Sequence, residues 1–75
     1  MNIQICDFMN LYHGNKALAN IVINKRHYSD ESKKTSDMEV YEGKYIDMPS
    51  DMRYDTIRKW DIEMRHYKVF LVLYI

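Results

Sequence analysis

Four side chains of this sequence are of the types that form a nucleophile–base pair: Cys6, His13, His27 and His66. A thiol–imidazole catalyst needs the two groups within hydrogen-bonding distance of each other. His13 follows Cys6 by seven positions, which is about two helical turns, or ~10 Å, and too far for a direct hydrogen bond. His27 or His66 would have to reach Cys6 through folding. The pattern therefore favours Cys6 as a small apolar residue of a helix or core over a reactive thiol.

The acidic residues and glycines offer little other chemistry. Asp51 and Asp55 stand at i and i+4, but Arg53 lies between them in sequence and nothing completes a cation cage. We interpret them as acids favoured at the start of a helix by its dipole. No C-x-x-C or H-E-x-x-H spacing occurs, and two glycines are too few for a phosphate-binding loop. We therefore expect no enzymatic activity, no metal and no cofactor.

Bulk properties limit the class of partner and the compartment. The 75 residues carry 11 basic and 11 acidic side chains, so the net charge is zero. That balance argues against a dedicated duplex-DNA binder and against a strongly acidic DNA mimic. The single cysteine excludes an intrachain disulfide and favours a reduced compartment such as the cytoplasm. We see no signal peptide and no apolar run of ~20 residues, so we expect no membrane contact.

The first half of the chain is predicted to form a helix and a strand. Residues 3–13 place Ile5, Phe8 and Met9 on one helical face, and Gly14 is typical of the residue that ends a helix. Residues 17–28 contain the β-branched run Ile21-Val22-Ile23 and are predicted to be the first strand. Residues 29–37 are entirely polar, so we expect an exposed connection.

The second half is predicted to form three more strands. Residues 38–48 alternate without a cleanly apolar face, which indicates an edge strand, and Gly43 indicates a bulge or bend. Pro49 ends that strand, and residues 51–56 are predicted as a short helix or turn. From residue 57 the alternation returns and predicts a half-buried antiparallel strand. Its apolar side carries Trp60, Ile62 and Met64. Residues 69–75 are apolar on both faces, as expected of a central strand.

These elements predict one small α+β domain covering residues 1–75. Its N-terminal helix is packed on an antiparallel sheet of three to four strands, with a short helical turn before the last two. Seven tyrosines and six methionines exceed what one small core can bury, and such side chains are enriched at protein interfaces. The contact surface that we predict joins charged residues of the polar connection to the second strand: Asp30, Glu31, Lys33, Lys34, Tyr41, Glu42 and Tyr45.

The segment from Tyr41 to Pro49 resembles part of the small accessory proteins of Gram-positive bacteriophages. These proteins often open with a short helix like the one at residues 3–12, carry a G-x-x-x-D-x-P segment, and end in an apolar strand. Here the segment is formed by Gly43, Asp47 and Pro49, and the likeness covers most of the chain. Members with a known role bind host or defence proteins, CRISPR nucleases among them. The composition, rich in residues with A- and T-rich codons, fits a low-GC bacterium or its phage.

Three hypotheses of function follow. The first is a phage-encoded, non-catalytic protein that binds and inhibits a bacterial host or defence protein, such as a CRISPR effector. The second is a small nucleic-acid-binding or regulatory domain that uses Lys25, Arg26, Lys33, Lys34 and the tyrosines. It ranks lower because acidic residues interleaved in the same region repel phosphates. The third is a self-assembling structural accessory protein with the second strand as its exposed edge. A homodimer is compatible with all three.

Overall fold

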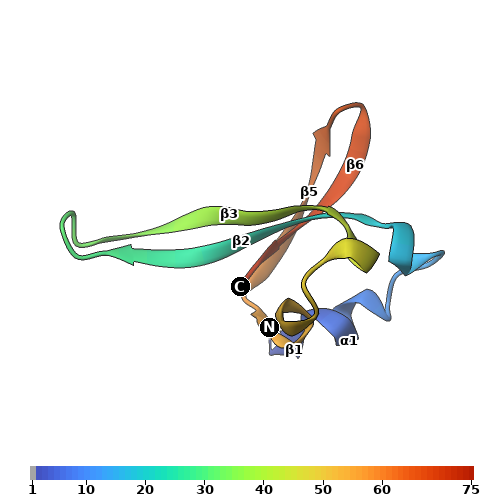
Figure 1. The fold of residues 1–75 in the computed structure, drawn as a ribbon, viewed down its shortest axis with the longest axis horizontal. Helices are drawn as coiled ribbons and strands as arrows, with labels where there is room; N and C mark the ends of the chain where they lie inside the picture. The colour runs from blue at the N-terminus through green and yellow to red at the C-terminus, as the bar shows by residue number, and fades with distance from the viewer. Residues whose placement is uncertain (1) are drawn as a thin grey trace.

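The computed structural model describes residues 2–75 and contains mainly strands joined by short helical turns (Figure 1). In chain order the elements are β1 (Ile3–Gln4), α1 (Ile5–Met9), η1 (Lys16–Leu18), β2 (Asn20–Ser29), β3 (Lys34–Lys44), η2 (Tyr45–Asp47), η3 (Ser50–Tyr54), β4 (Thr56–Ile57), β5 (Lys59–Arg65) and β6 (Lys68–Tyr74). The main sheet has the order β3-β2-β6-β5, and β1 pairs with β4 in a separate ribbon. The α+β class is thus confirmed at this coarse level.

The main sheet is mixed, which differs from the antiparallel sheet that the sequence predicts. β2 pairs antiparallel with β3 but parallel with β6, and β6 pairs antiparallel with β5. The parallel pair arises because residues 45–58 carry the chain to the far side of the sheet, where β5 becomes the outer strand. β6 then returns beside β2 in the same direction. The central place of β6 and the edge place of β3 are confirmed.

The helix is shorter than predicted and covers only one end of the sheet. Ile3 and Gln4, which the sequence predicts as the start of the helix, instead form β1 and pair with β4. The backbone N–H of Ile5 donates to the Asp55 carbonyl at 3.0 Å. At the other end the chain leaves the helix at Asn10 and turns through Gly14, whose φ of 128° suits glycine. Within residues 2–75 no helix is both long and apolar enough to cross a bilayer.

The apolar side chains form two clusters on opposite faces of the sheet. The larger cluster lies between the sheet and the helical turns, and its buried members are Ile5, Met9, Ala19, Ile21, Ile23, Tyr45, Met48, Ile57 and Leu73. The smaller cluster, on the other face, consists of Val22, Phe70 and Val72, with Tyr74 packed against it. Side-chain alternation along β2 and β6 explains this division, because neighbouring residues of a strand point to opposite faces.

Charged side chains surround the smaller cluster. Arg65, on β5, contacts Glu39 at 2.6 Å, Glu63 at 3.1 Å and Glu42 at 3.8 Å. Glu39 and Glu42 belong to β3, and β6 and β2 lie between β3 and β5, so these ion pairs span the face that holds the cluster. Hydrogen bonds to Glu39 and Glu63 raise the pKa of Arg65, which keeps its guanidinium charged.

The predicted connection at residues 29–37 is wrong in extent, because most of it belongs to a long hairpin. β2 runs to Ser29 and β3 begins at Lys34, so only residues 30–33 form the turn. The bulge also lies elsewhere than predicted: Val40 is the extra residue, since Ile23 pairs with Tyr41 and Asn24 with Glu39. We call residues 25–38 the arm; Figure 1 shows it projecting from the rest of the molecule.

Candidate functional site

The thiol and the imidazoles lie on different elements. Cys6 is half-buried in α1, His13 follows that helix, His27 lies on the arm and His66 in the turn between β5 and β6. Among residues 2–75 no hydrogen bond joins Cys6 to a histidine, and the Cys6 thiol donates weakly to Gln4 Oε1 at 3.8 Å. His66 Nε2 instead lies 3.4 Å from Glu42. Within residues 2–75 no three His, Cys, Asp or Glu side chains are placed so that they could hold a metal ion.

The seven residues predicted as one contact surface fall into two separate groups. Asp30, Glu31, Lys33 and Lys34 are exposed at the tip of the arm. Within residues 2–75 no ion pair or side-chain hydrogen bond holds these four side chains. The other three residues, Tyr41, Glu42 and Tyr45, belong to the body of the molecule, at the far end of β3 and in η2.

The two tyrosines of the second group have structural contacts. The Tyr41 hydroxyl donates to the Lys44 carbonyl at 2.6 Å, and its ring lies over Gly43, where an added Cβ would stand 2.8 Å from the hydroxyl. Tyr45 is buried, with the guanidinium of Arg53 5.1 Å from its ring centre. Burial raises the pKa of both phenols, with Asp47 adding to the effect at Tyr41. The exposed part of the predicted surface is therefore the arm tip, together with Glu42.

The two faces of the arm differ in charge. Cross-strand pairing and alternation place Lys25, His27, Ser29, Lys34, Ser36 and Met38 on one face. Arg26, Tyr28, Thr35 and Asp37 share the other. Asp37 at the base of the arm forms an ion pair with Arg58, which precedes β5. Beyond that base no other element of residues 2–75 lies beside the ribbon (Figure 1), so its two faces and two edges are open to a partner.

A second surface, which the sequence did not single out, lies on the β5–β6 hairpin. Pairing of Ile62 with Leu71 and of Met64 with Val69 places these side chains on the face of the sheet that also carries α1. The helix stops short of them, so Ile62 is 57% exposed and Met64 70% exposed. We call six residues the apolar face: Leu11, Trp60, Ile62, Met64 and Val69, with Tyr67 at the tip of the hairpin. The half-buried strand predicted at residues 57–64 is thus mostly exposed.

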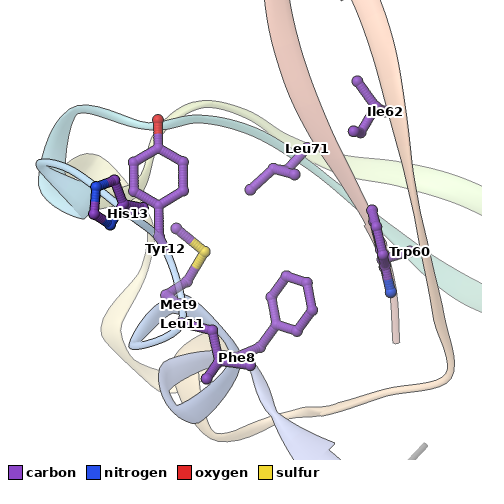
Figure 2. A pocket seen from close by; sticks show the side chains of 8 residues that line it. All are labelled: Phe8, Met9, Leu11, Tyr12, His13, Trp60, Ile62 and Leu71. Carbon is purple, nitrogen blue, oxygen red and sulfur yellow. The ribbon is translucent and has the colours of Figure 1, made fainter.

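A pocket of about 290 Å³ lies at one end of the apolar face (Figure 2). Its lining comes from α1 and the residues after it on one side and from β5 and β6 on the other: Phe8, Met9, Leu11, Tyr12, His13, Trp60, Ile62 and Leu71. Two of the lining rings, those of Phe8 and Trp60, contact each other with their centroids 5.9 Å apart. This space is suited to an apolar side chain, because aliphatic, Met and aromatic side chains supply all of its lining except His13.

The hairpin tip holds a strained turn. His66 and Tyr67 both have positive φ, 52° and 62°, as a two-residue type I′ turn requires. Such turns favour Asn and Gly, because the left-handed conformation costs other residues about 1 kcal/mol or more each. The Tyr67 side chain is fully exposed. The turn therefore presents a large aromatic side chain at a position where stability alone would favour glycine.

Comparison with protein families, with curated proteins and with solved structures finds no match to this chain. The two surfaces described above are therefore the basis for assigning its function.

Proposed function

We propose that this chain is a non-catalytic binding protein that attaches to another protein through its arm. The observation that carries the proposal is the projection of the arm from the body, with the charges of its tip held by no other described residue. An isolated two-stranded ribbon is marginally stable in water, so covering one face or edge with a partner stabilises it. Following the resemblance to phage accessory proteins, the partner is a bacterial host or defence protein that the chain inhibits.

The charge pattern of the tip supports a protein partner. Asp30 and Glu31 are followed by Lys33 and Lys34, so the tip has no net charge. A phosphate backbone repels the two acids, whereas a protein surface with mixed charges can pair with both signs. Tyr28 and Met38, both more than half exposed, add apolar area to opposite faces of the same ribbon.

Affinity purification from extracts of a low-GC Gram-positive host tests this proposal. The wild-type chain should recover a protein that resists nuclease treatment, and the purified partner should lose activity when the chain is added. A variant in which Asn-Gly replaces residues 28–35 should lose the partner and keep its fold, because His27 and Ser36 already pair across the ribbon.

Single charge reversals supply a matched comparison. Glu31→Lys should weaken binding about tenfold, while Asp51→Lys, an equal change on the body, should leave it unaltered. Recovery of nucleic acid alone, or equal binding by the arm-shortened variant, would overturn the assignment.

Nucleic-acid binding is the second candidate, and one observation favours it. Lys25, His27 and Lys34 share a face of the arm that carries no carboxylate, and the major groove of DNA admits a two-stranded ribbon. This candidate requires retardation of DNA or RNA probes that weakens steeply with salt. It also requires loss of that retardation in a Lys25→Glu, Lys34→Glu variant.

A further inference from the structure

The apolar face is too large to be an ordinary exposed surface. Its six side chains are between 46% and 100% exposed. Together they offer on the order of 700 Å² of mainly apolar area, close to the ~800 Å² that each partner buries in a standard protein interface. Monomeric soluble proteins rarely expose contiguous apolar patches of more than a few hundred Å².

The strand beneath this face has no core of its own. Six of the seven residues of β5 are exposed and the seventh, Arg65, is half-buried, so backbone pairing with β6 is its main link to the sheet. A chain of 75 residues buries little apolar area on folding, and small domains often gain further stability by forming oligomers. A molecule covering the apolar face would give β5 the core that it lacks.

The shape and charge of the face fit a copy of itself. Trp60 and Ile62 line the pocket (Figure 2), and the pairing register places Met64 and Val69 beyond Ile62, toward the tip of the hairpin. Trp60 and Met64 are four residues apart, which is ~13 Å along a strand. A twofold axis near Ile62 therefore brings Met64 of one copy to the pocket of the other. The six side chains of the face carry no formal charge, so no like charges oppose each other across this axis.

We propose that the chain forms a twofold symmetric homodimer in which the apolar faces of two β5–β6 hairpins pack against each other. The contact is face to face, at the ~10 Å spacing of packed sheets. It leaves the free edges of β3 and β5 outside the interface. The strained turn fits this arrangement, because Tyr67 lies beyond Met64 and its ring then faces the partner past Trp60, at the end of the sheet that α1 covers, rather than water. This inference stands apart from the proposed function, because the arm takes no part in the dimer contact.

Sedimentation measured from about 5 to about 500 µM tests the proposal. Wild-type chain should sediment as a dimer over most of this range. Ile62→Lys should weaken the dimer at least ~100-fold, because it buries a charge at the centre of the interface. Ile46→Lys is the matched control, since Ile46 is 56% exposed but lies in η2, outside the apolar face. That variant should remain a dimer.

Trp60 gives a second readout that does not depend on a variant folding. It is the only tryptophan and is 46% exposed in the single chain, so dimer formation should shift its emission to shorter wavelength. Dilution should reverse the shift over the concentrations at which sedimentation shows dissociation.

Three results would overturn the proposal. The first is a wild-type chain that is still a monomer at about 500 µM, which would mean that a different protein covers the apolar face. The second is a dimer that persists in Ile62→Lys. The third is open-ended assembly in place of a closed pair.

Discussion

Tyr45 is a phenol that the fold keeps away from water. Its side chain is 7% exposed, and burial raises its pKa above the ordinary value of 10.0 even though Arg53 opposes the shift. A raised pKa in the folded state stabilises the protein only while the phenol is neutral. Below the unfolded-state pKa both states hold the proton. Above it the unfolded chain loses its proton first, so stability falls as the pH rises through the folded-state value.

Alkaline unfolding should therefore depend on this hydroxyl. Tyr45→Phe keeps the ring and its contact with Arg53 but removes the titrating group. We expect wild type to lose more unfolding free energy than Tyr45→Phe between about pH 8 and about pH 11, measured by urea denaturation. Tyr28→Phe, which removes a hydroxyl from a residue that is 56% exposed on the arm, is the control and should behave as wild type. Equal pH slopes for wild type and Tyr45→Phe would contradict the role assigned to burial.

At the scale of elements, Arg65 is the link between the two outer strands of the sheet. Its guanidinium lies at the end of β5 and reaches Glu39 and Glu42 on β3. Exposed ion pairs contribute little one at a time, but a single Arg bonded to several carboxylates also neutralises their mutual repulsion. The alkyl part of a long side chain can in addition cover apolar surface such as that of Val22 and Phe70.

Arg65→Ala should accordingly lower the Tm by roughly 5 °C, whereas Lys68→Ala should change it by about a degree or less. Lys68 is a suitable control because it is an exposed cation and because it stands opposite Arg65 in the backbone pairing of β5 with β6. Part of the Arg65 effect should disappear in about 1 M salt, which screens the repulsion left among the carboxylates. Thermal unfolding followed by circular dichroism measures both. An effect of Arg65→Ala that salt leaves unchanged would mean that lost packing alone is responsible.

The sequence predicts those elements in which the pattern of apolar and polar side chains shows whether the element is buried. Residues 69–75 are apolar on both faces, and this is enough to place β6 in the centre of the sheet. The sequence does not predict the outer part of the arm, because the side chains of residues 29–37 are polar and mostly exposed. Their strands are held by backbone hydrogen bonds, which do not require apolar side chains. The parallel β2–β6 pair escaped because it depends on where residues 45–58 cross, which is a long-range property.

The candidate site could be predicted only in part, because side-chain patterns do not show which elements pack against each other. Alternation in β5 shows that Trp60, Ile62 and Met64 share one side of a strand, but the pattern does not say what covers that side. The short α1 leaves it open, because the pairing of β1 with β4 makes the helix begin only at Ile5 and the chain leaves it at Asn10. Conversely, residue type alone predicts Tyr45 as a contact residue, whereas the fold places it in the core.

At the scale of the whole molecule, the arm and the β5–β6 hairpin project in different directions (Figure 1). A dimer held by the hairpins would therefore carry two free arms. Two arms that engage neighbouring sites of one assembly bind far more tightly than one, without any new contact. Arm binding and dimer formation are thus compatible and can be tested separately, because each can be disabled by a variant that leaves the other surface intact.

Dimer formation also makes the stability of the fold depend on protein concentration. If the second copy supplies a core for β5, folding and association are linked, and the native state gains stability as the chain is concentrated. Raising the concentration about 100-fold should increase the Tm of wild type by roughly 5–10 °C. Ile62→Lys should show a Tm independent of concentration, and Ile46→Lys should follow wild type. A wild-type Tm that stays constant across that range would mean that the single chain is stable with its apolar face in water.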